Sequence, residues 1–421
     1  MRSTVLWIAI TLGSSSCAER TPGAADSQPR QGCTGAGCGP ERGASPLRDE
    51  GESDPSGTAP MNTEEVVTPG GLIGSGNSSS GTAAPADGRE NSAASDAGAA
   101  GNAPDSGGPA LDRCDVGVFD PDRPPQALAL SGNLGAHDPV IIAADGQYHY
   151  FSTGNGISVK TSTDLLRWTQ QPDVFPTTPA WFEELVPAYA PRNIWAPDIS
   201  YFGGQYHLYY SVSSFGSNRS CIGHATRPSL TQGSWTDHEN AFCSNQPGQN
   251  DNYNAIDPNV VLDETGSPWL AFGSFWSGVK MIRLDLNGDR TGTELIDLAS
   301  RGGGAIEAPF LVRRCGYYYL FVSFDACCQG ANSTYNTRVG RARELLGPYL
   351  ARDGTPMLEG GGSLLLQAGG DWVGPGHNAI LIVGTRAYNV YHAYAAGNGA
   401  SQLRISELVW DGDGWPISGG P

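Results

Sequence analysis

The sequence has few basic residues. It carries 25 Lys and Arg against 43 Asp and Glu among 421 residues, a formal net charge of −18. With no basic stripe to neutralise phosphates, the chain is not expected to bind nucleic acid. Part of the acidic excess lies in residues 18–113, which hold fourteen acidic and six basic residues. The acidity itself says little about a substrate.

Long apolar runs are also missing. The longest stretch near the start, Val5–Leu12, follows Arg2 and is too short to cross a bilayer, so residues 1–17 are predicted to be an export signal peptide. Small residues lead to Cys17, an arrangement that resembles a bacterial lipobox, although Ser14 stands where Leu or Val is usual. Two outcomes follow: a cell-surface lipoprotein whose only membrane contact is a lipid on Cys17, or ordinary cleavage and a secreted protein.

Aromatic residues are absent from residues 18–112, where Gly, Ser, Ala, Pro, Asp and Glu dominate. Such a composition cannot bury enough apolar surface to offset the entropy lost on ordering. The prediction is a disordered linker over 18–112 that joins the export signal to one globular domain over 113–421. We expect that domain to be a monomer.

The nine cysteines suit an oxidising compartment, and no CxxC spacing supports a metal site. Without Cys17, eight remain. Cys33 and Cys38 are close enough to bridge within the linker, and Cys221 with Cys243 could close a loop in the globular domain. The pairing of the adjacent Cys327 and Cys328 stays open.

The globular domain shows no long helical periodicity. Its short aromatic runs, for example residues 147–151, 205–210 and 317–321, are typical of half-buried strands, and Gly-containing turns separate them. The domain is therefore predicted to be all-β.

A unit recurs five times in this domain. The unit has an acidic residue, a Pro close to it, an apolar run, a turn and an aromatic strand, and the fifth copy has His in place of the carboxylate. The key positions lie 50 to 70 residues apart: Asp138, Asp198, Asp257, Glu307 and His377. Repeats of this length predict a five-bladed β-propeller. Because the inner strand of every blade faces the central axis, carboxylates far apart in the sequence can meet there. Capping of a turn between blades is the alternative, and we adopt it for Asp198.

The acids suit sugar hydrolysis. Breaking a glycosidic bond needs an acid for the leaving oxygen and a base or nucleophile for the anomeric carbon, and a third carboxylate nearby can keep the acid protonated. Aromatic rings near the inner strands could stack on sugars or simply pack the blades: Trp195, Phe215, Phe275 and Trp276.

Several motifs occur in the order typical of glycoside hydrolase family 43, at residues 136–139, 195–198, 254–258, 273–278 and 306–309. The segments 321–328, 333–335, 339–341 and 347–349 resemble those of the endo-α-1,5-L-arabinanases in particular. The likeness extends over residues 130–415. It implies a five-bladed propeller that hydrolyses internal α-1,5-L-arabinofuranosyl bonds of arabinan with inversion.

The resemblance also implies roles for residues. Asp138 corresponds to the general base, Glu307 to the general acid and Asp257 to the group that raises the pKa of Glu307, and inversion implies a base–acid separation of roughly 6.5–9.5 Å. His377 corresponds to a histidine at a metal, usually Ca²⁺, in the propeller centre; because Ca²⁺ prefers oxygen, a metal-free hydrogen-bonded His377 is the alternative. Substrate contacts are implied for Asn254, Ala255, Ile256, Ser274, Phe275, Trp276, Gly216 and Trp195.

Three other functions compete with this interpretation. An exo-acting arabinofuranosidase or a β-xylosidase of the same fold shares the three acids. A retaining fructan-type propeller is disfavoured because its nucleophile and acid occupy different motifs. A tethered glycan-binding propeller without catalysis would suit the anchor and linker, but it does not require all three acids.

Overall fold

The computed structural model describes residues 112–189 and 193–421. The predicted signal peptide, Cys17, Cys33 and Cys38 lie outside these residues, as does the predicted linker except for Asp112, which accepts a hydrogen bond from the Gly316 N–H (2.8 Å). In the described part of the chain, no helix is long and apolar enough to span a membrane.

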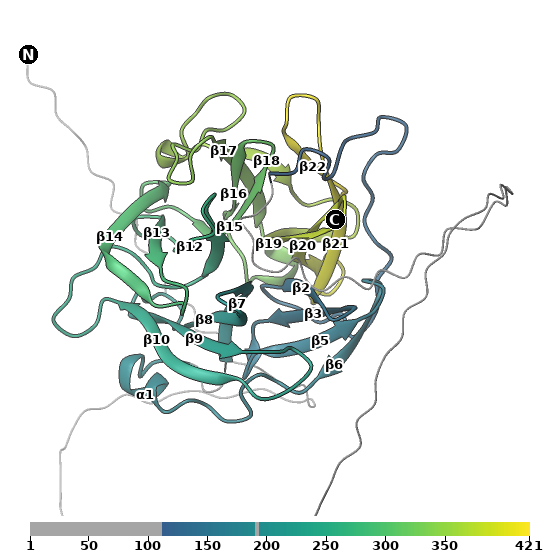
Figure 1. Ribbon diagram of the computed structural model, residues 1–421. Coiled ribbons are helices and arrows are strands. Elements are labelled where there is room, and N and C mark those ends of the chain that lie inside the picture. The colour runs from purple at the N-terminus through teal and green to yellow at the C-terminus, as the bar shows by residue number, and fades with distance from the viewer. Residues whose placement is uncertain (1–111, 190–192) are drawn as a thin grey trace, which may run out of the picture. The chain divides into compact units, whose positions relative to one another are not determined.

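Five sheets surround a central axis, and their strand pairs are antiparallel except for β1 with β6; this confirms the predicted five-bladed β-propeller (Figure 1). The first two sheets, blades 1 and 2, each contain five strands and follow each other in the sequence. Blade 1 comprises β1 (Ser131–Gly132), β2 (Val140–Ala144), β3 (Gln147–Ser152), β5 (Ser158–Ser162) and β6 (Arg167–Gln171). Blade 2 comprises β4 (Gly154–Asn155), β7 (Asn193–Phe202), β8 (Gln205–Val212), β9 (Ser220–Arg227) and β10 (Thr236–Ser244), and the short helix α1 (Trp181–Leu185) precedes β7.

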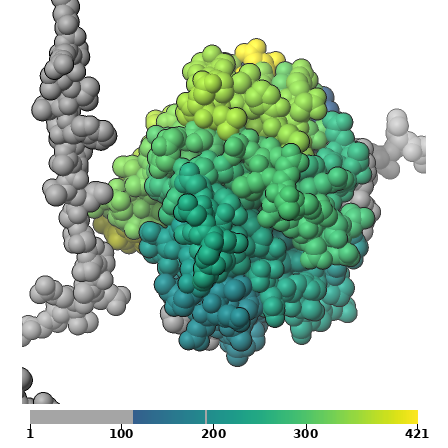
Figure 2. Space-filling view, turned by 90° about the vertical axis from the view of Figure 1, so that its left-hand side faces the viewer, coloured from purple at the N-terminus to yellow at the C-terminus, as the bar shows by residue number. Residues whose placement is uncertain are grey.

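The other three blades contain four strands each. Blade 3 consists of β11 (Asn259–Leu262), β12 (Pro268–Phe272), β13 (Val279–Leu284) and β14 (Arg290–Ala299). Blade 4 consists of β15 (Ile306–Arg314), β16 (Tyr317–Phe324), β17 (Asn336–Ala342) and β18 (Ser363–Leu366), with 3₁₀ turns η1 (Gly330–Asn332) and η2 (Met357–Glu359). Blade 5 consists of β19 (Trp372–Val383), β20 (Arg386–Ala395), β21 (Ser401–Trp410) and β22 (Pro416–Ser418). Seen from the side of blade 3, residues of blade 4 lie above it and residues of blade 2 below (Figure 2).

Tight turns connect the inner strands to their neighbours. Asp145 and Gly146 both have positive φ (50° and 73°) and link β2 to β3 in register Ala144↔Gln147. This is the two-residue hairpin whose twist matches that of the strands, and it requires left-handed residues. Gly203 in the β7–β8 turn is under a further constraint, because a Cβ there would lie 2.2 Å from the Leu286 carbonyl oxygen.

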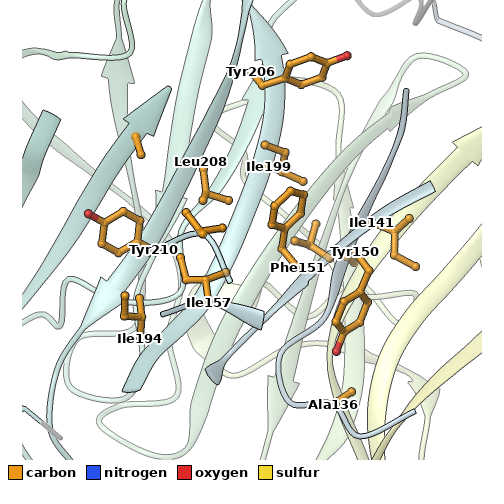
Figure 3. Close-up of a cluster of buried hydrophobic side chains, with 14 of the residues drawn as sticks. Ala136, Ile141, Tyr150, Phe151, Ile157, Ile194, Ile199, Tyr206, Leu208 and Tyr210 are labelled. Carbon is orange, nitrogen blue, oxygen red and sulfur yellow. The ribbon is translucent and has the colours of Figure 1, made fainter. Parts of the chain in front are cut away.

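The largest hydrophobic core lies between blades 1 and 2 and extends to blade 5. Figure 3 shows part of this core: Phe151 of β3 lies near Ile199 of β7, with Leu208 of β8 beyond it, whereas Tyr150 of β3 lies on the other side, near Ile141 of β2. These side chains are at most 6% exposed. Burying each large apolar side chain contributes about 1.5–3 kcal/mol, so packing between blades supplies much of the stability.

The first and last blades do not share a sheet, and the chain before β2 joins them. Val118 bridges Trp410, Ala127 bridges Ser406, and the Leu403 N–H donates to Leu134 O (2.7 Å). A Cys114–Cys315 disulfide also ties this segment to blade 4 across 201 residues of sequence. Pairing had not been predicted for these two cysteines, whereas the predicted Cys221–Cys243 bridge is present.

Each inner strand is preceded or interrupted by a residue in the left-handed region. These residues are Asp138, Ala196, Asp257, Ala308 and His377, with φ between 43° and 57°. Their positions correct the repeat alignment: Ala196 and Ala308, not Asp198 and Glu307, share the backbone position of Asp138. A non-glycine residue in this conformation costs on the order of 1–3 kcal/mol and persists only where the surroundings hold it.

The surroundings hold it by hydrogen bonds between blades. The backbone N–H of each left-handed residue donates to a side chain of the preceding blade or of the loop next to it. The five pairs, with distances of 2.8–3.1 Å, are Asp138 to His392 Nδ1, Ala196 to Thr153 Oγ1, Asp257 to Ser211 Oγ, Ala308 to Asp257 Oδ2, and His377 to Ser323 Oγ. We call these contacts the inter-blade ring.

Asp198 links blades 2 and 3, in agreement with the structural role expected for it. Its carboxylate accepts hydrogen bonds from Asn259 Nδ2 (3.1 Å) and the Val260 N–H (2.9 Å). Asn259 occupies the corresponding position of blade 3 and accepts from the Leu311 N–H of blade 4 (2.8 Å). Asp198 and Asn259 thus occupy equivalent positions in consecutive blades, and each accepts a backbone N–H of the following blade.

Replacing Asp198 with alanine should destabilise the propeller by about 2–4 kcal/mol, because two buried donors lose their acceptor. Urea unfolding monitored by tryptophan fluorescence measures the change. Asp122→Ala, at an exposed position, is the matched control and should leave the free energy of unfolding nearly unchanged. Equal stability of the two variants would contradict the assignment.

Candidate active site

Three carboxyl groups and one imidazole from four blades meet near the central axis. Asp138 precedes β2, Asp257 precedes β11, Glu307 lies in β15 and His377 in β19. The charges of Asp138, Glu307 and His377 all influence the ionisation of Asp257. The inner strands that carry these residues contact one another around the ring, including β19 with β2.

Asp138 is held in its ionised form. Its Oδ1 lies 2.9 Å from His137 Nδ1 and 3.1 Å from His377 Nδ1, and its Oδ2 accepts a hydrogen bond from Thr153 Oγ1. Burial opposes ionisation, but the charges and hydrogen bonds of the two histidines outweigh it and hold the pKa of Asp138 well below its usual value. A buried carboxylate with this surrounding is suited to accept a proton.

The pKa of Glu307 is shifted in the opposite direction from that of Asp138. Burial raises the pKa of Glu307, and the negative charge of Asp138 adds to the effect, although hydrogen bonds from Ser274 and Tyr335 oppose it. Ser274 Oγ donates to Glu307 Oε2 at 2.8 Å. Two carboxyl groups in one site thus have pKa values shifted in opposite directions, the arrangement needed for paired acid and base chemistry.

Asp257 interacts electrostatically with both of these groups. Burial, with the charges of Glu307 and Asp138, raises the pKa of Asp257 to about 7, and His377 opposes the shift. Asp257 Oδ2 accepts the Ala308 N–H (3.1 Å), which directly follows Glu307. The Asp257 carboxyl group therefore anchors the backbone next to Glu307, and the charge of Glu307 in turn disfavours the ionised form of Asp257.

Sequence reasoning missed the residues that orient Asp138. His137 Nε2 lies 2.8 Å from the Tyr394 hydroxyl, and His392 stacks on His137 with ring centroids 4.0 Å apart. His137 was visible next to Asp138 in its motif, but its role was not. His392 and Tyr394 occupy β20, and no local signal places them in the site.

His137, Asp138 and His392 also form a group with metal-ligand geometry among the described residues. Hydrogen bonds among these residues and their neighbours explain their close approach without a metal ion. His392 Nδ1 accepts the Asp138 N–H, so its proton sits on Nε2, which is buried and finds no partner in the described part of the chain. That tautomer leaves His392 without a free lone pair for a metal.

His377 faces Asp138 and is anchored through its backbone to Ser323 Oγ (2.8 Å). Burial lowers its basicity, but the charge of Asp138 and the hydrogen bond between them outweigh this and raise the pKa of His377 to about 9. Burial raises the pKa of Asp198 to about 6, and its carboxyl group accepts hydrogen bonds from Asn259 and Val260.

The residues expected to contact substrate fall into two groups. Phe275, Trp276, Trp195 and Gly216 are at least partly exposed, and the ring of Trp195 lies 5.0 Å from that of the exposed Phe215. The Phe275 N–H donates to Ile306 O (2.8 Å), which brings this loop next to Glu307. Asn254, Ala255, Ile256 and Ser274 are buried; Ala255 belongs to the core of blades 2 and 3, and Ser274 contacts Glu307.

Ser274→Ala should raise the pKa of Glu307 further, because the Ser274 hydroxyl stabilises the ionised carboxylate. Titration of the Glu307 side-chain carboxyl carbon by ¹³C NMR measures the shift. Ser267→Ala, in a turn of the same blade, serves as control and should leave this titration unchanged. A lower pKa in Ser274→Ala would contradict the assignment.

Comparisons with known proteins agree with this geometry. Residues 132–416 match the model of Glycosyl hydrolases family 43. The chain is 45% identical over 287 residues to the extracellular endo-α-(1→5)-L-arabinanase 1 of Bacillus subtilis, covering 66% of this chain and 86% of that protein. It is 40% identical over 301 residues to the extracellular exo-α-(1→5)-L-arabinofuranosidase ArbA of Cellvibrio japonicus, covering 67% and 86%.

A solved structure, the α-L-arabinanase of Cellvibrio cellulosa complexed with arabinohexaose, matches with a TM-score of 0.64 and 38% identity over 68% of this chain and 95% of that one. The family match extends over more than half of the sequence and includes all three carboxyl groups of the site. The chain belongs to glycoside hydrolase family 43 and is a glycosidase.

Proposed function

We propose that this glycosidase cleaves internal α-1,5-L-arabinofuranosyl bonds of arabinan with inversion. The observation that carries the proposal is the pair Asp138 and Glu307, with their pKa values shifted in opposite directions at one site. The likeness to an endo-α-(1→5)-L-arabinanase supports the choice of bond and polymer.

In this mechanism Glu307 protonates the leaving glycosidic oxygen while Asp138 takes a proton from the attacking water. His137, His377 and Thr153 hold Asp138 ionised and oriented for that step. Asp257, when ionised, would favour the protonated form of Glu307 through charge repulsion, and it fixes the backbone of Glu307 through the Ala308 N–H. Inversion requires room for the water, which is the reason for a base–acid separation of roughly 6.5–9.5 Å.

We assign the substrate contacts to the exposed aromatic residues beside these acids. Trp195 and Phe215 form a pair on blade 2, Phe275 and Trp276 form the loop of blade 3, and Gly216 follows Phe215 in its loop. Rings in such positions can stack on furanose faces and contribute affinity. Asn254, Ala255 and Ile256 would support this surface from behind, because their side chains are buried.

An exo-acting arabinofuranosidase is the second candidate, because a relative of that description is 40% identical. Both enzymes need the same three acids, so the site chemistry does not separate them. The products do: an endo enzyme releases mixed oligosaccharides from linear arabinan early in the reaction, and an exo enzyme releases a single short product.

Glu307→Gln tests the function. The variant should lose at least about 10³-fold in kcat on linear arabinan, because the leaving group is no longer protonated, while it still binds arabino-oligosaccharides in calorimetry. The anomeric configuration of the wild-type products is read by ¹H NMR, and the matched control Glu294→Gln lies on the exposed strand β14. Binding without hydrolysis by the wild type would favour a carbohydrate-binding propeller instead, and retention would exclude the proposed mechanism.

We further propose that His377 binds Ca²⁺ at the propeller centre. Asp138 Oδ1 faces His377 Nδ1 and orients the ring so that Nε2 is the remaining ligand atom; because the pKa of His377 is raised to about 9, Ca²⁺ would have to displace the Nε2 proton to bind there. Waters would supply the oxygen ligands that Ca²⁺ prefers. When bound, the ion would supply positive charge near the carboxylates.

Calcium titration of chelator-treated protein by isothermal calorimetry tests this site. We expect stoichiometric binding by the wild type and its loss in His377→Ala. His238→Ala, at a histidine on β10, is the control and should bind as the wild type does. Equal binding by all three proteins would place the ion elsewhere.

Export is supported by the extracellular description of both relatives. We propose that residues 1–17 direct the export and that Cys17 carries a lipid, which would leave the propeller on a cell surface. Mass spectrometry of the mature N-terminus separates this from simple secretion.

A further inference from the structure

The loop between β16 and β17 carries a disulfide between the adjacent residues Cys327 and Cys328. Cys328 is exposed and has a φ of 65°, in the left-handed region that a non-glycine residue seldom adopts. The short covalent ring of an adjacent-cysteine disulfide restricts this backbone. The ring therefore fixes the direction of the Cys328 N–H, and without the disulfide this direction would not be maintained.

The Cys328 N–H begins a series of hydrogen bonds that ends at Asp138, the proposed general base. The Cys328 N–H donates to the Tyr394 hydroxyl oxygen (2.9 Å), the Tyr394 hydroxyl lies 2.8 Å from His137 Nε2, and His137 Nδ1 lies 2.9 Å from Asp138 Oδ1. When the His137 ring is charged, its Nε2–H donates to the Tyr394 oxygen and the same three contacts persist; when the ring is neutral with its proton on Nδ1, every donor in this series points toward Asp138. Hydrogen bonds aligned in this way strengthen one another.

The same loop also reaches the general acid. Its last residue, Tyr335, hydrogen-bonds with Glu307, and the Tyr335 N–H donates to Ala326 O (3.0 Å) at the start of the loop. The Gln329 N–H donates to Ser333 Oγ (3.0 Å), and η1 contacts β19 and β20 of blade 5. The disulfide thus sits in a loop that joins the two catalytic carboxyl groups across blades 4 and 5.

We propose that the Cys327–Cys328 disulfide positions the general base Asp138 through Tyr394 and His137, so that its reduction slows hydrolysis; this rests on the proposed function. The reductant is a dithiol. Its thiolate attacks one sulfur, the S–S bond breaks, and a second attack closes the dithiol into a cyclic disulfide. Cys327 and Cys328 gain two electrons and two protons, and the dithiol loses them.

The proposal makes Cys327 and Cys328 positioning residues. Opening the ring frees the Cys328 N–H, Tyr394 loses its donor, and the His137 ring can rotate away from Asp138. Misplacement of a reacting group lowers kcat, by about 10- to 100-fold for shifts near 1 Å. KM should change little, because the exposed aromatic residues that we assign to substrate contacts lie on blades 2 and 3.

Steady-state kinetics on linear arabinan test the proposal with a double-mutant cycle. Tyr394→Phe and the pair Cys327→Ala/Cys328→Ala should each lower kcat about tenfold or more, and the triple variant should lose no more than either alone, since both changes break one series of contacts. Tyr391→Phe, on the same strand as Tyr394, is the control: it removes a hydroxyl that hydrogen-bonds with Ser406 of β21, and kcat should stay unchanged. Multiplicative losses, or a raised KM with unchanged kcat, would overturn the proposal; the latter would indicate direct contact between the disulfide and sugar.

Reduction provides a second measurement that needs no cysteine variant to fold. Dithiothreitol should lower kcat of the wild type, reoxidation should restore it, and Tyr394→Phe should not respond. Mass spectrometry after alkylation verifies that Cys327 and Cys328 are reduced while Cys114–Cys315 and Cys221–Cys243 remain intact. An unchanged kcat in the reduced wild type would contradict the proposed role of the disulfide. A wild type inactive on arabinan before any reduction would count against the proposed function and not against this contact series.

Discussion

The inter-blade ring is the constraint on which the site depends. In each blade a residue adopts the left-handed conformation just before the inner strand continues, and its N–H donates to a side chain of the blade before it. The strained conformation and the hydrogen bond support each other, because the kink directs the N–H outward to the neighbouring blade. At Asp138, Asp257 and His377 it also places a functional side chain near the axis.

Once the side chains are gathered there, burial makes their charges interact strongly. Both carboxyl groups are buried, and burial raises the pKa of each; beside Asp138 two histidines reverse the shift, whereas beside Glu307 the hydroxyl groups of Ser274 and Tyr335 oppose it without reversing it. Asp257 has both a structural and an electrostatic part in this, because it accepts the Ala308 N–H and because the charges of Glu307 and Asp138 raise its own pKa. The hydrogen bond from the Ala308 N–H to Asp257 therefore links two blades and also places Asp257 where its charge interacts with the other carboxyl groups.

Much of the architecture was predictable from local patterns. Gly-containing turns and aromatic runs indicate short strands, and the spacing of five similar units indicates five blades. The exact equivalence of positions was not predictable: Asp198 lies two residues past the kink at Ala196, and Glu307 one residue before the kink at Ala308. Sequence alignment matches residue types, whereas the backbone conformation decides which residue occupies the turn.

The sequence by itself determined the fold class, the three acids and their order, because these depend on periodicity and on residue chemistry at short range. Only the tertiary structure decided what surrounds those acids. His392 and Tyr394 lie more than 250 residues after Asp138, at separations of 254 for His392 and 257 between His137 and Tyr394, and Cys114 pairs with Cys315 across 201. Contacts at such separations arise when the propeller closes on itself, and no local pattern specifies them.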